Sequence, residues 1–255
     1  MKRALSLIGL SIIFVLSPGQ VIAGERQTSD APSAKERTTA SKLGRFGAPP
    51  NRQSGGGRST DSAQSMIALV PGSPLSATTP SQSYLVRTAS EPLAVWVYIP
   101  QEYQSAPGAE LVLLDETGAI PLQISPVNLV STSEATIIRL PIDYPLEPDQ
   151  VYRWQFTVTV NPDDINGNHT VGGLIETVAP TGDLARQIEQ AQPANLDQIY
   201  TQHDIWHDAL TRLGESRMAD PHNETLKASW TNLLASVGLG ELADVPLGTC
   251  CQTPL

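Results

Sequence analysis

The chain has few aromatic residues, few cysteines and no excess of basic charge. Its 255 residues carry 16 Lys and Arg against 26 Asp and Glu, a formal net charge of −10. A nucleic-acid-binding domain presents a basic surface, so this balance argues against nucleic acid as a partner. Aromatic residues make up 5% of the chain, which argues against stacking platforms for bases. The length is sufficient for one or two domains and a sizeable hydrophobic core.

Cysteine occurs only as the adjacent pair Cys250 and Cys251, close to the C-terminus. A disulfide between sequence neighbours closes a strained ring, so an internal covalent link is not expected here. We interpret the two residues as free or weakly engaged thiols on a flexible tail, residues 248–255.

The N-terminal residues have the pattern of a secretory signal. Lys2 and Arg3 precede a nearly unbroken apolar run, residues 4–16, and small residues lead up to Ala23. This order is typical of a signal peptide, residues 1–23, cleaved after Ala23. A membrane anchor is the alternative, but the run is shorter than the ~20 apolar residues of a spanning helix. No later run reaches that length, so we expect an exported protein, periplasmic or extracellular, whose mature form has no membrane span.

Residues 24–65 are rich in Ser, Thr, Gly, Pro and Arg and poor in apolar side chains. Seven Lys and Arg against four Asp and Glu give this segment a charge of +3. Such a composition buries too little apolar surface to offset the entropy of ordering the chain. The segment is therefore predicted to be a disordered basic linker.

Residues 66–180 have the pattern of an antiparallel β-sandwich. Short β-branched and aromatic runs, several alternating with period two, are separated by turn residues and prolines. No helical periodicity interrupts them, and spacings of this kind are typical of a sandwich. About seven strands are expected, at residues 84–88, 93–99, 111–114, 119–124, 136–140, 151–160 and 170–178.

Residues 181–247 are predicted to be helical, with helices at 195–203, 205–218 and 223–237. Leu196 and Trp230 are separated by 34 residues, the period of the tetratricopeptide repeat, although an ordinary helical hairpin describes the pattern equally well. One and a half repeats bury too little surface to stand alone, so the apolar face should pack on the sandwich or on a partner. The expected fold class is α+β, a β-sandwich followed by a helical hairpin resembling a tetratricopeptide repeat.

The cluster His203, Asp204, His207 and Asp208 is the pattern most suggestive of chemistry. Two histidines four residues apart with neighbouring carboxylates are able to ligate zinc or another divalent metal. The repeat register, however, puts a turn at His203–Asp204, which would aim the two imidazoles in different directions, and no third ligand has convincing spacing. We therefore interpret these residues as solvated or capping groups around a core Trp206. No catalytic residue, cofactor-binding residue, metal site or cofactor is assigned.

An ordered series of motifs extends over residues 45–251. The series comprises Arg45-x-Gly47-Ala48-Pro49, Ala68-Leu69-Val70-Pro71, Trp96-x-Tyr98-x-Pro100, Leu113-Leu114-Asp115-Glu116-x-Gly118, Tyr152-x-Trp154, Val171-x-Gly173-x-Ile175, Ile205-Trp206-x-Asp208-Ala209-Leu210 and Trp230-x-x-Leu233-Leu234-x-Ser236-Val237-Gly238-Leu239. In these motifs the chain resembles the cyanobacterial secreted proteins classed as domain of unknown function 928. The resemblance implies export and one coherent fold, and it implies no activity.

Three functions are compatible with the sequence. We expect a non-enzymatic envelope module that binds another envelope protein or a surface polymer. One alternative is a metal-dependent hydrolase that uses the cluster of His203, Asp204, His207 and Asp208. The other is a carbohydrate-binding sandwich, which would need exposed aromatic residues. The candidates for that role, Trp96, Tyr98 and Trp154, lie within strand patterns that are more typical of a core.

Overall fold

The computed structural model describes residues 65–72, 85–89, 92–124, 126–127, 129, 134–164, 167–192 and 195–250. The predicted signal peptide and all but the last residue of the predicted linker lie outside these ranges. The expectations for those two segments therefore stay predictions.

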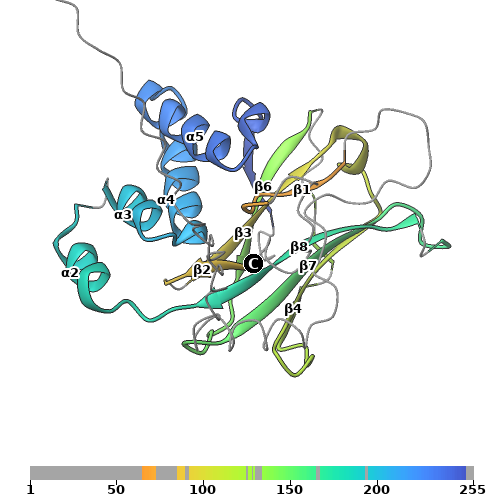
Figure 1. Cartoon of the computed structure of the whole chain (residues 1–255). Coiled ribbons are helices and arrows are strands. Elements are labelled where there is room, and N and C mark those ends of the chain that lie inside the picture. Colours follow the sequence, from red (N-terminus) through yellow and green to blue (C-terminus); the bar gives the residue numbers. More distant parts are fainter. Residues whose placement is uncertain are drawn as a thin grey trace, which may run out of the picture.

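Nine strands form two sheets in the described part of the chain (Figure 1). The four-stranded sheet, called here the inner sheet, has the order β1 (Ile67–Ala68), β3 (Leu93–Ile99), β6 (Thr136–Ile142), β9 (Leu247–Thr249). The five-stranded outer sheet has the order β2 (Leu85–Thr88), β8 (His169–Thr177), β7 (Val151–Thr159), β4 (Gly108–Leu114), β5 (Leu122–Ile124). Side chains from both sheets form one continuous hydrophobic core, so the predicted α+β class and the sandwich are confirmed.

Two strand pairings differ from the antiparallel expectation. The β2–β8 pair and the β6–β9 pair are parallel, whereas the other pairings are antiparallel. Parallel neighbours need a long crossover connection. Between β6 and β9 the chain passes through β7 and β8 of the outer sheet and then through the helices, a connection that a reading of local hairpins does not anticipate.

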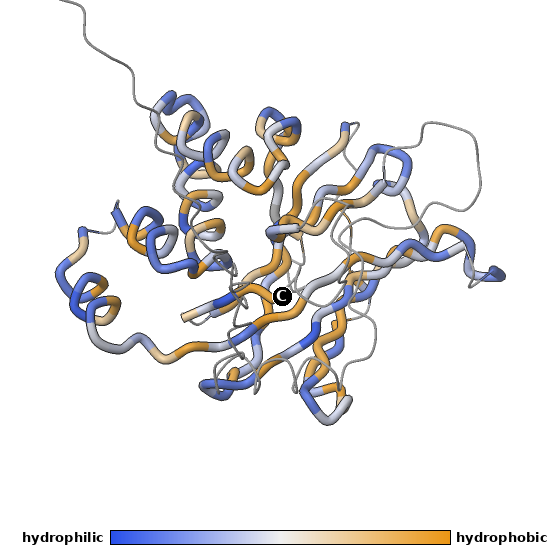
Figure 2. Tube along the Cα trace, in the orientation of Figure 1, coloured by the Kyte–Doolittle hydropathy of each residue, from blue (hydrophilic) through white to orange (hydrophobic). Residues whose placement is uncertain are grey.

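Strand β3 is buried at all seven positions. Because side chains alternate between the two faces of a strand, both faces of β3 must be covered. Trp96 on one face reaches the helices, since its Nε1 donates to Thr211 Oγ1 at 3.1 Å. Val95 and Val97 lie on the opposite face, toward the outer sheet. The inner sheet is thus covered by the helices on one face and by the outer sheet on the other. Figure 2 colours much of its strands as hydrophobic.

Among the described residues after β8, four α-helices gather on one side of the sheets (Figure 1), and the short 3-10 helix Gly240–Leu242 follows them. The four α-helices are α2 (Gly182–Gln190), α3 (Leu196–Gln202), α4 (Trp206–Ala219) and α5 (Glu224–Ser236). The last three agree with the predicted helices to within one residue at each end. The predicted turn at His203–Asp204 is also present, and Asp204 has φ 58° there. Helix α5 begins at an Asn223 cap, whose side chain accepts from two backbone amides, and Gly238 follows it with φ 73°.

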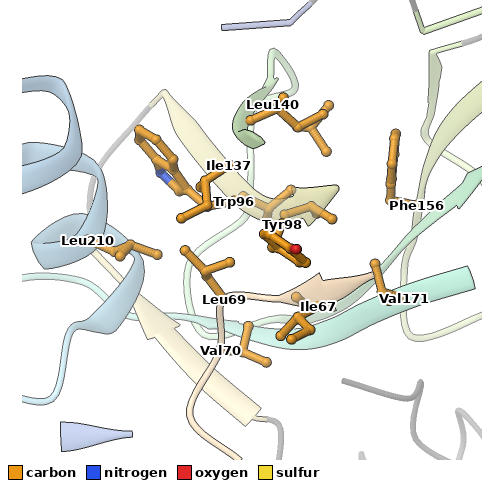
Figure 3. Packing of buried hydrophobic residues seen from close by; sticks show 14 of the residues in the cluster. Ile67, Leu69, Val70, Trp96, Tyr98, Ile137, Leu140, Phe156, Val171 and Leu210 are labelled. Carbon is orange, nitrogen blue, oxygen red and sulfur yellow. The ribbon is translucent and has the colours of Figure 1, made fainter. Parts of the chain in front are cut away.

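Helices α4 and α5 pack directly on the inner sheet. The Trp96 and Trp230 rings lie 6.0 Å apart between centroids and are tilted by 59°. Leu210 of α4 belongs to the same core as the strands (Figure 3). The apolar face of the helices therefore packs on the sandwich, which is one of the two possibilities that the sequence left open. The likeness to a tetratricopeptide repeat stays a prediction.

The C-terminal residues correct the expectation for the cysteines. Strand β9 pairs with β6, and the Cys250 amide donates to Arg139 O at 3.3 Å. Cys250 is buried and disulfide-bonded, and the chain has one other cysteine. The expected free thiol and the expected absence of an internal disulfide are therefore both wrong. Gly248 lies within β9 although a flexible tail was expected from residue 248, and Cys251 lies outside the described residues. The prediction of a tail was wrong because the chain returns to the inner sheet after the helices and pairs with β6.

Gly214 provides a test of the packing between α4 and the inner sheet. A Cβ atom at this position would lie 2.6 Å from Trp96 Cη2 and 2.8 Å from Trp96 Cζ2. In an open helix Gly→Ala stabilises by roughly 1 kcal/mol. Here the overpacking should outweigh that gain, and Gly214→Ala should destabilise the fold by about 1–3 kcal/mol.

Thermal unfolding measures this effect, and the melting temperature should fall by about 2–4 °C for each kcal/mol in a domain of this size. Ser216→Ala on the exposed side of the same helix is the control, and its melting temperature should stay close to that of wild type. A Gly214→Ala protein that melts higher than wild type would contradict the close approach of α4 to Trp96.

Candidate functional site

The structure separates the four residues of the predicted cluster. His203 follows α3, with its Nε2 3.3 Å from Gln187 Oε1, and Asp204 is exposed in the turn. His207 and Asp208 lie in the first turn of α4 and are buried, with exposed fractions of 1% and 5%. The two histidines therefore have different surroundings, His203 beside α2 and His207 inside the fold. The expectation that the second pair is solvated is wrong, because the start of α4 inserts against the sheets.

Two contacts from the first turn of α4 tie it to both sheets. Asp208 Oδ2 accepts from Thr88 Oγ1 at 2.8 Å and from the Ala89 amide at 3.0 Å, at the end of β2 in the outer sheet. Trp206 Nε1 donates to Leu69 O at 2.9 Å, just after β1 in the inner sheet. The helix start is thereby held where the two sheets meet.

A pocket of about 140 Å³ lies beside this turn. It combines an apolar wall from the start of β3 with polar groups from α4, β6 and the end of β2. The lining residues are Thr88, Pro92, Leu93, Ala94, Arg139, His207, Asp208, Thr211, Arg212 and Glu215.

Helix α4 supplies the polar side of the pocket from successive turns. Asp208, Thr211 or Arg212, and Glu215 follow the spacing of three to four residues that keeps side chains on one helix face. Glu215 Oε1 pairs with the Arg139 guanidinium of β6 at 2.9 Å. Arg212 is exposed at the rim. The formal charges of the pocket are thus two guanidinium groups and two carboxylates.

His207 is the unusual member of the lining. Its side chain is almost fully buried, and neither Nδ1 nor Nε2 has a hydrogen-bond partner among the residues the structure describes. Burial lowers the pKa of the imidazole from 6.5 to about 3, so the ring is neutral at neutral pH. A buried polar group without a partner costs about 1–3 kcal/mol, and such groups are uncommon in native folds. This ring, at the wall of a pocket, marks the candidate site.

The chemistry available to the pocket is that of hydrogen bonding. The Asp208 carboxylate accepts two hydrogen bonds from β2 and its neighbour, and the Glu215 carboxylate is in an ion pair, so both are engaged in holding the fold. A base with a pKa near 3 is weak at neutral pH. Within the described ranges, no group of three or more His, Cys, Asp or Glu side chains is placed to hold a metal ion.

The aromatic residues considered for carbohydrate binding are not on the surface. Trp96, Tyr98 and Trp154 have exposed fractions of 1%, 3% and 0%. Their assignment to the core is confirmed, and they offer no aromatic platform for a sugar. Across the described ranges, no helix has the length and apolar character needed to cross a membrane.

Reasoning from the sequence found two of the lining residues, His207 and Asp208, and missed the others. The spacing of Thr211, Arg212 and Glu215 behind Asp208 was a usable signal, because it marks a polar stripe on a helix whose other face is apolar. No comparable signal pointed to Arg139 or Thr88. They come from strands far away in the sequence, and only the fold brings them to α4.

Comparison with known proteins gives one family. A family model described as Domain of Unknown Function (DUF928) matches residues 51–247. The range includes both sheets up to the start of β9 and all four helices, and it excludes the motif at Arg45–Pro49. A search of curated proteins found no match.

The buried imidazole predicts a pH dependence of stability. The unfolded chain binds a proton at His207 below about pH 6.5, whereas the folded protein does so only near pH 3. The unfolded state therefore holds more protons between these values, and stability falls as the pH decreases through that window. His207→Phe removes this contribution, so its advantage in unfolding free energy over wild type should grow by about 2 kcal/mol from pH 6.5 to pH 4.5.

Urea denaturation of both proteins at the two pH values measures the difference. The other ionisable side chains are common to both proteins, so their contributions largely cancel in the comparison. The same stability difference at both pH values would mean that His207 titrates alike in the folded and unfolded states.

Proposed function

This chain belongs to the DUF928 family, and from that premise we propose that it is a non-enzymatic binding protein of the cell envelope. The pocket beside α4 takes up a small polar part of the partner, which is a surface polymer or another envelope protein. The signal-like residues 1–23 support export to the periplasm or the exterior.

The observation that carries this proposal is the state of His207. His207 lines the pocket, and both nitrogens of its neutral ring are buried and unpaired in the described structure. A polar group of the partner that moves the neighbouring side chains aside to reach one nitrogen gains a hydrogen bond there. The gain is large because the ring is already removed from bulk water and already oriented by helix α4. Binding therefore offsets the free-energy cost of leaving the buried imidazole unpaired. Because the ring is held on a rigid helix, little side-chain entropy is lost when the partner binds.

The state of the carboxylates supports a binding role over a hydrolytic one. General acid–base catalysis needs a group that exchanges a proton near the working pH. Asp208 and Glu215 are instead committed to hydrogen bonds and an ion pair with the strands. The hydrolase alternative also used His203 and Asp204, which lie in the turn before α4 and do not line the pocket.

Co-sedimentation with the envelope fraction of the source organism tests the proposal. Arg212→Glu reverses a charge at the pocket rim and should lower the fraction of bound protein about tenfold. Arg186→Glu makes the same charge change on α2, at a side chain that is 70% exposed and outside the pocket lining, and should leave binding unchanged.

Equal binding by both variants, or no binding by wild type, would contradict the proposal. Elemental analysis of the same preparation separates the hydrolase alternative. A transition metal bound in a one-to-one ratio would favour that alternative over a binding module.

A further inference from the structure

Cys250 fixes the end of β9 against the inner sheet. Its side chain is 4% exposed and belongs to the hydrophobic core, and its amide donates to Arg139 O at 3.3 Å. Strand β9 itself is only three residues long and lies at the edge of the inner sheet. Short segments near a chain end open locally at low free energy. The constraint on Cys250 therefore decides how firmly this edge of the sheet is held.

That constraint is a disulfide between sequence neighbours. Cys250 is disulfide-bonded, and the only other cysteine of the chain is Cys251. One peptide bond joins the two residues, so their Cα atoms are at most about 3.8 Å apart. The usual separation in a disulfide is about 4.4–6.8 Å. A pair this close departs from the relaxed geometry, and such departures make the bond easier to reduce.

The bond acts locally, because it encloses no intervening residue. A disulfide that closes a long loop of the unfolded chain stabilises the whole fold, and this contribution grows with the length of the loop. Between neighbours the loop is the shortest that exists. The main effect of the bond is therefore on the backbone at Cys250, where a closed ring removes conformational freedom and favours the hydrogen bond to Arg139 O.

The end of β9 is also connected to the candidate site. Arg139, whose carbonyl oxygen accepts from the Cys250 amide, carries the guanidinium that pairs with Glu215 at 2.9 Å in the pocket lining. Helix α4, which provides Glu215, is in contact with β9 as well. A change at the end of β9 therefore acts directly on the backbone of a pocket residue.

We propose that the Cys250–Cys251 disulfide is a redox-sensitive bond that fixes the end of β9, with a thiol reductant as its reaction partner. A thiolate of the reductant attacks one sulfur of the pair and forms a mixed disulfide, and a second reductant thiol completes the exchange. The two reductant thiols end as a disulfide, and the chain gains two electrons and two protons as two thiols. The end of β9 then opens more readily beside Arg139.

Incubation of the oxidised full-length protein with reduced glutathione under native conditions tests this inference, and it needs no ligand of the pocket. Thiol titration in denaturant should find no free thiol before the incubation and both cysteines as thiols after it, whereas structural disulfides resist glutathione. The second readout is amide hydrogen exchange. The Cys250 amide should exchange about tenfold faster in the reduced protein. The Ile137 amide, which donates to Pro246 O at the other end of β9, should be unchanged.

Cys251→Ser is the matched variant, because it removes the bond and leaves Cys250 in place. Its Cys250 amide should exchange as in the reduced wild type, and glutathione should have no further effect. Free thiols in the oxidised protein, resistance of the bond to glutathione, or equal exchange of the Cys250 amide in both redox states would each overturn the proposal. Disulfide-linked dimers on a non-reducing gel would overturn it too. None of these outcomes bears on the co-sedimentation of Arg212→Glu, which decides the proposed function independently.

Discussion

The contact of Trp96 with Gly214 and Trp230 is the constraint on which the rest of the structure depends. Trp96 projects from β3, one of the two central strands of the inner sheet, and only a glycine on α4 leaves room for its ring. The second tryptophan closes the contact from α5 at a centroid distance of 6.0 Å. Large aromatic groups contribute most to the burial of apolar surface. The helices are therefore a third layer on the sandwich. After the helices the chain returns to the inner sheet as β9, which pairs with β6.

The close packing of α4 also explains why the candidate site exists. Once Gly214 is seated on Trp96, the first turn of the helix lies where the two sheets meet. Trp206 and Asp208 find partners there, on Leu69 and Thr88. His207 is carried between them into a buried position without a partner of its own in the described residues. A buried polar group of this kind lowers stability, and a ligand that pairs with it recovers that loss. The proposed binding function thus follows from the geometry of the helix.

The strands and helices were largely predictable because their signals are local. Alternation identified β7, and the run of apolar residues bounded by prolines identified β3. The turn at His203–Asp204 followed from helix spacing. The burial of His207 was not predictable, because it depends on the pairing of Thr88 with Asp208 across 120 residues of sequence. Strand β9 was not predicted for the same reason, because its parallel partner β6 lies about 100 residues earlier in the sequence. Composition alone made the residues from 248 onward look like a tail, whereas Gly248 and Thr249 pair with β6 and the Cys250 amide donates to Arg139 O.

Native-state hydrogen exchange tests most directly whether α4 belongs to the same cooperative unit as the sandwich. Amides in such a unit exchange only through global unfolding and so report one common free energy. If α4 is the third layer, the amides of Leu210 and Leu213 should show the same opening free energy as those of Val95 and Val97 in β3. They should also lose protection together with them when denaturant is added. Exchange of the α4 amides at a free energy several kcal/mol lower, with β3 still protected, would show that the helix detaches from an independently stable sandwich.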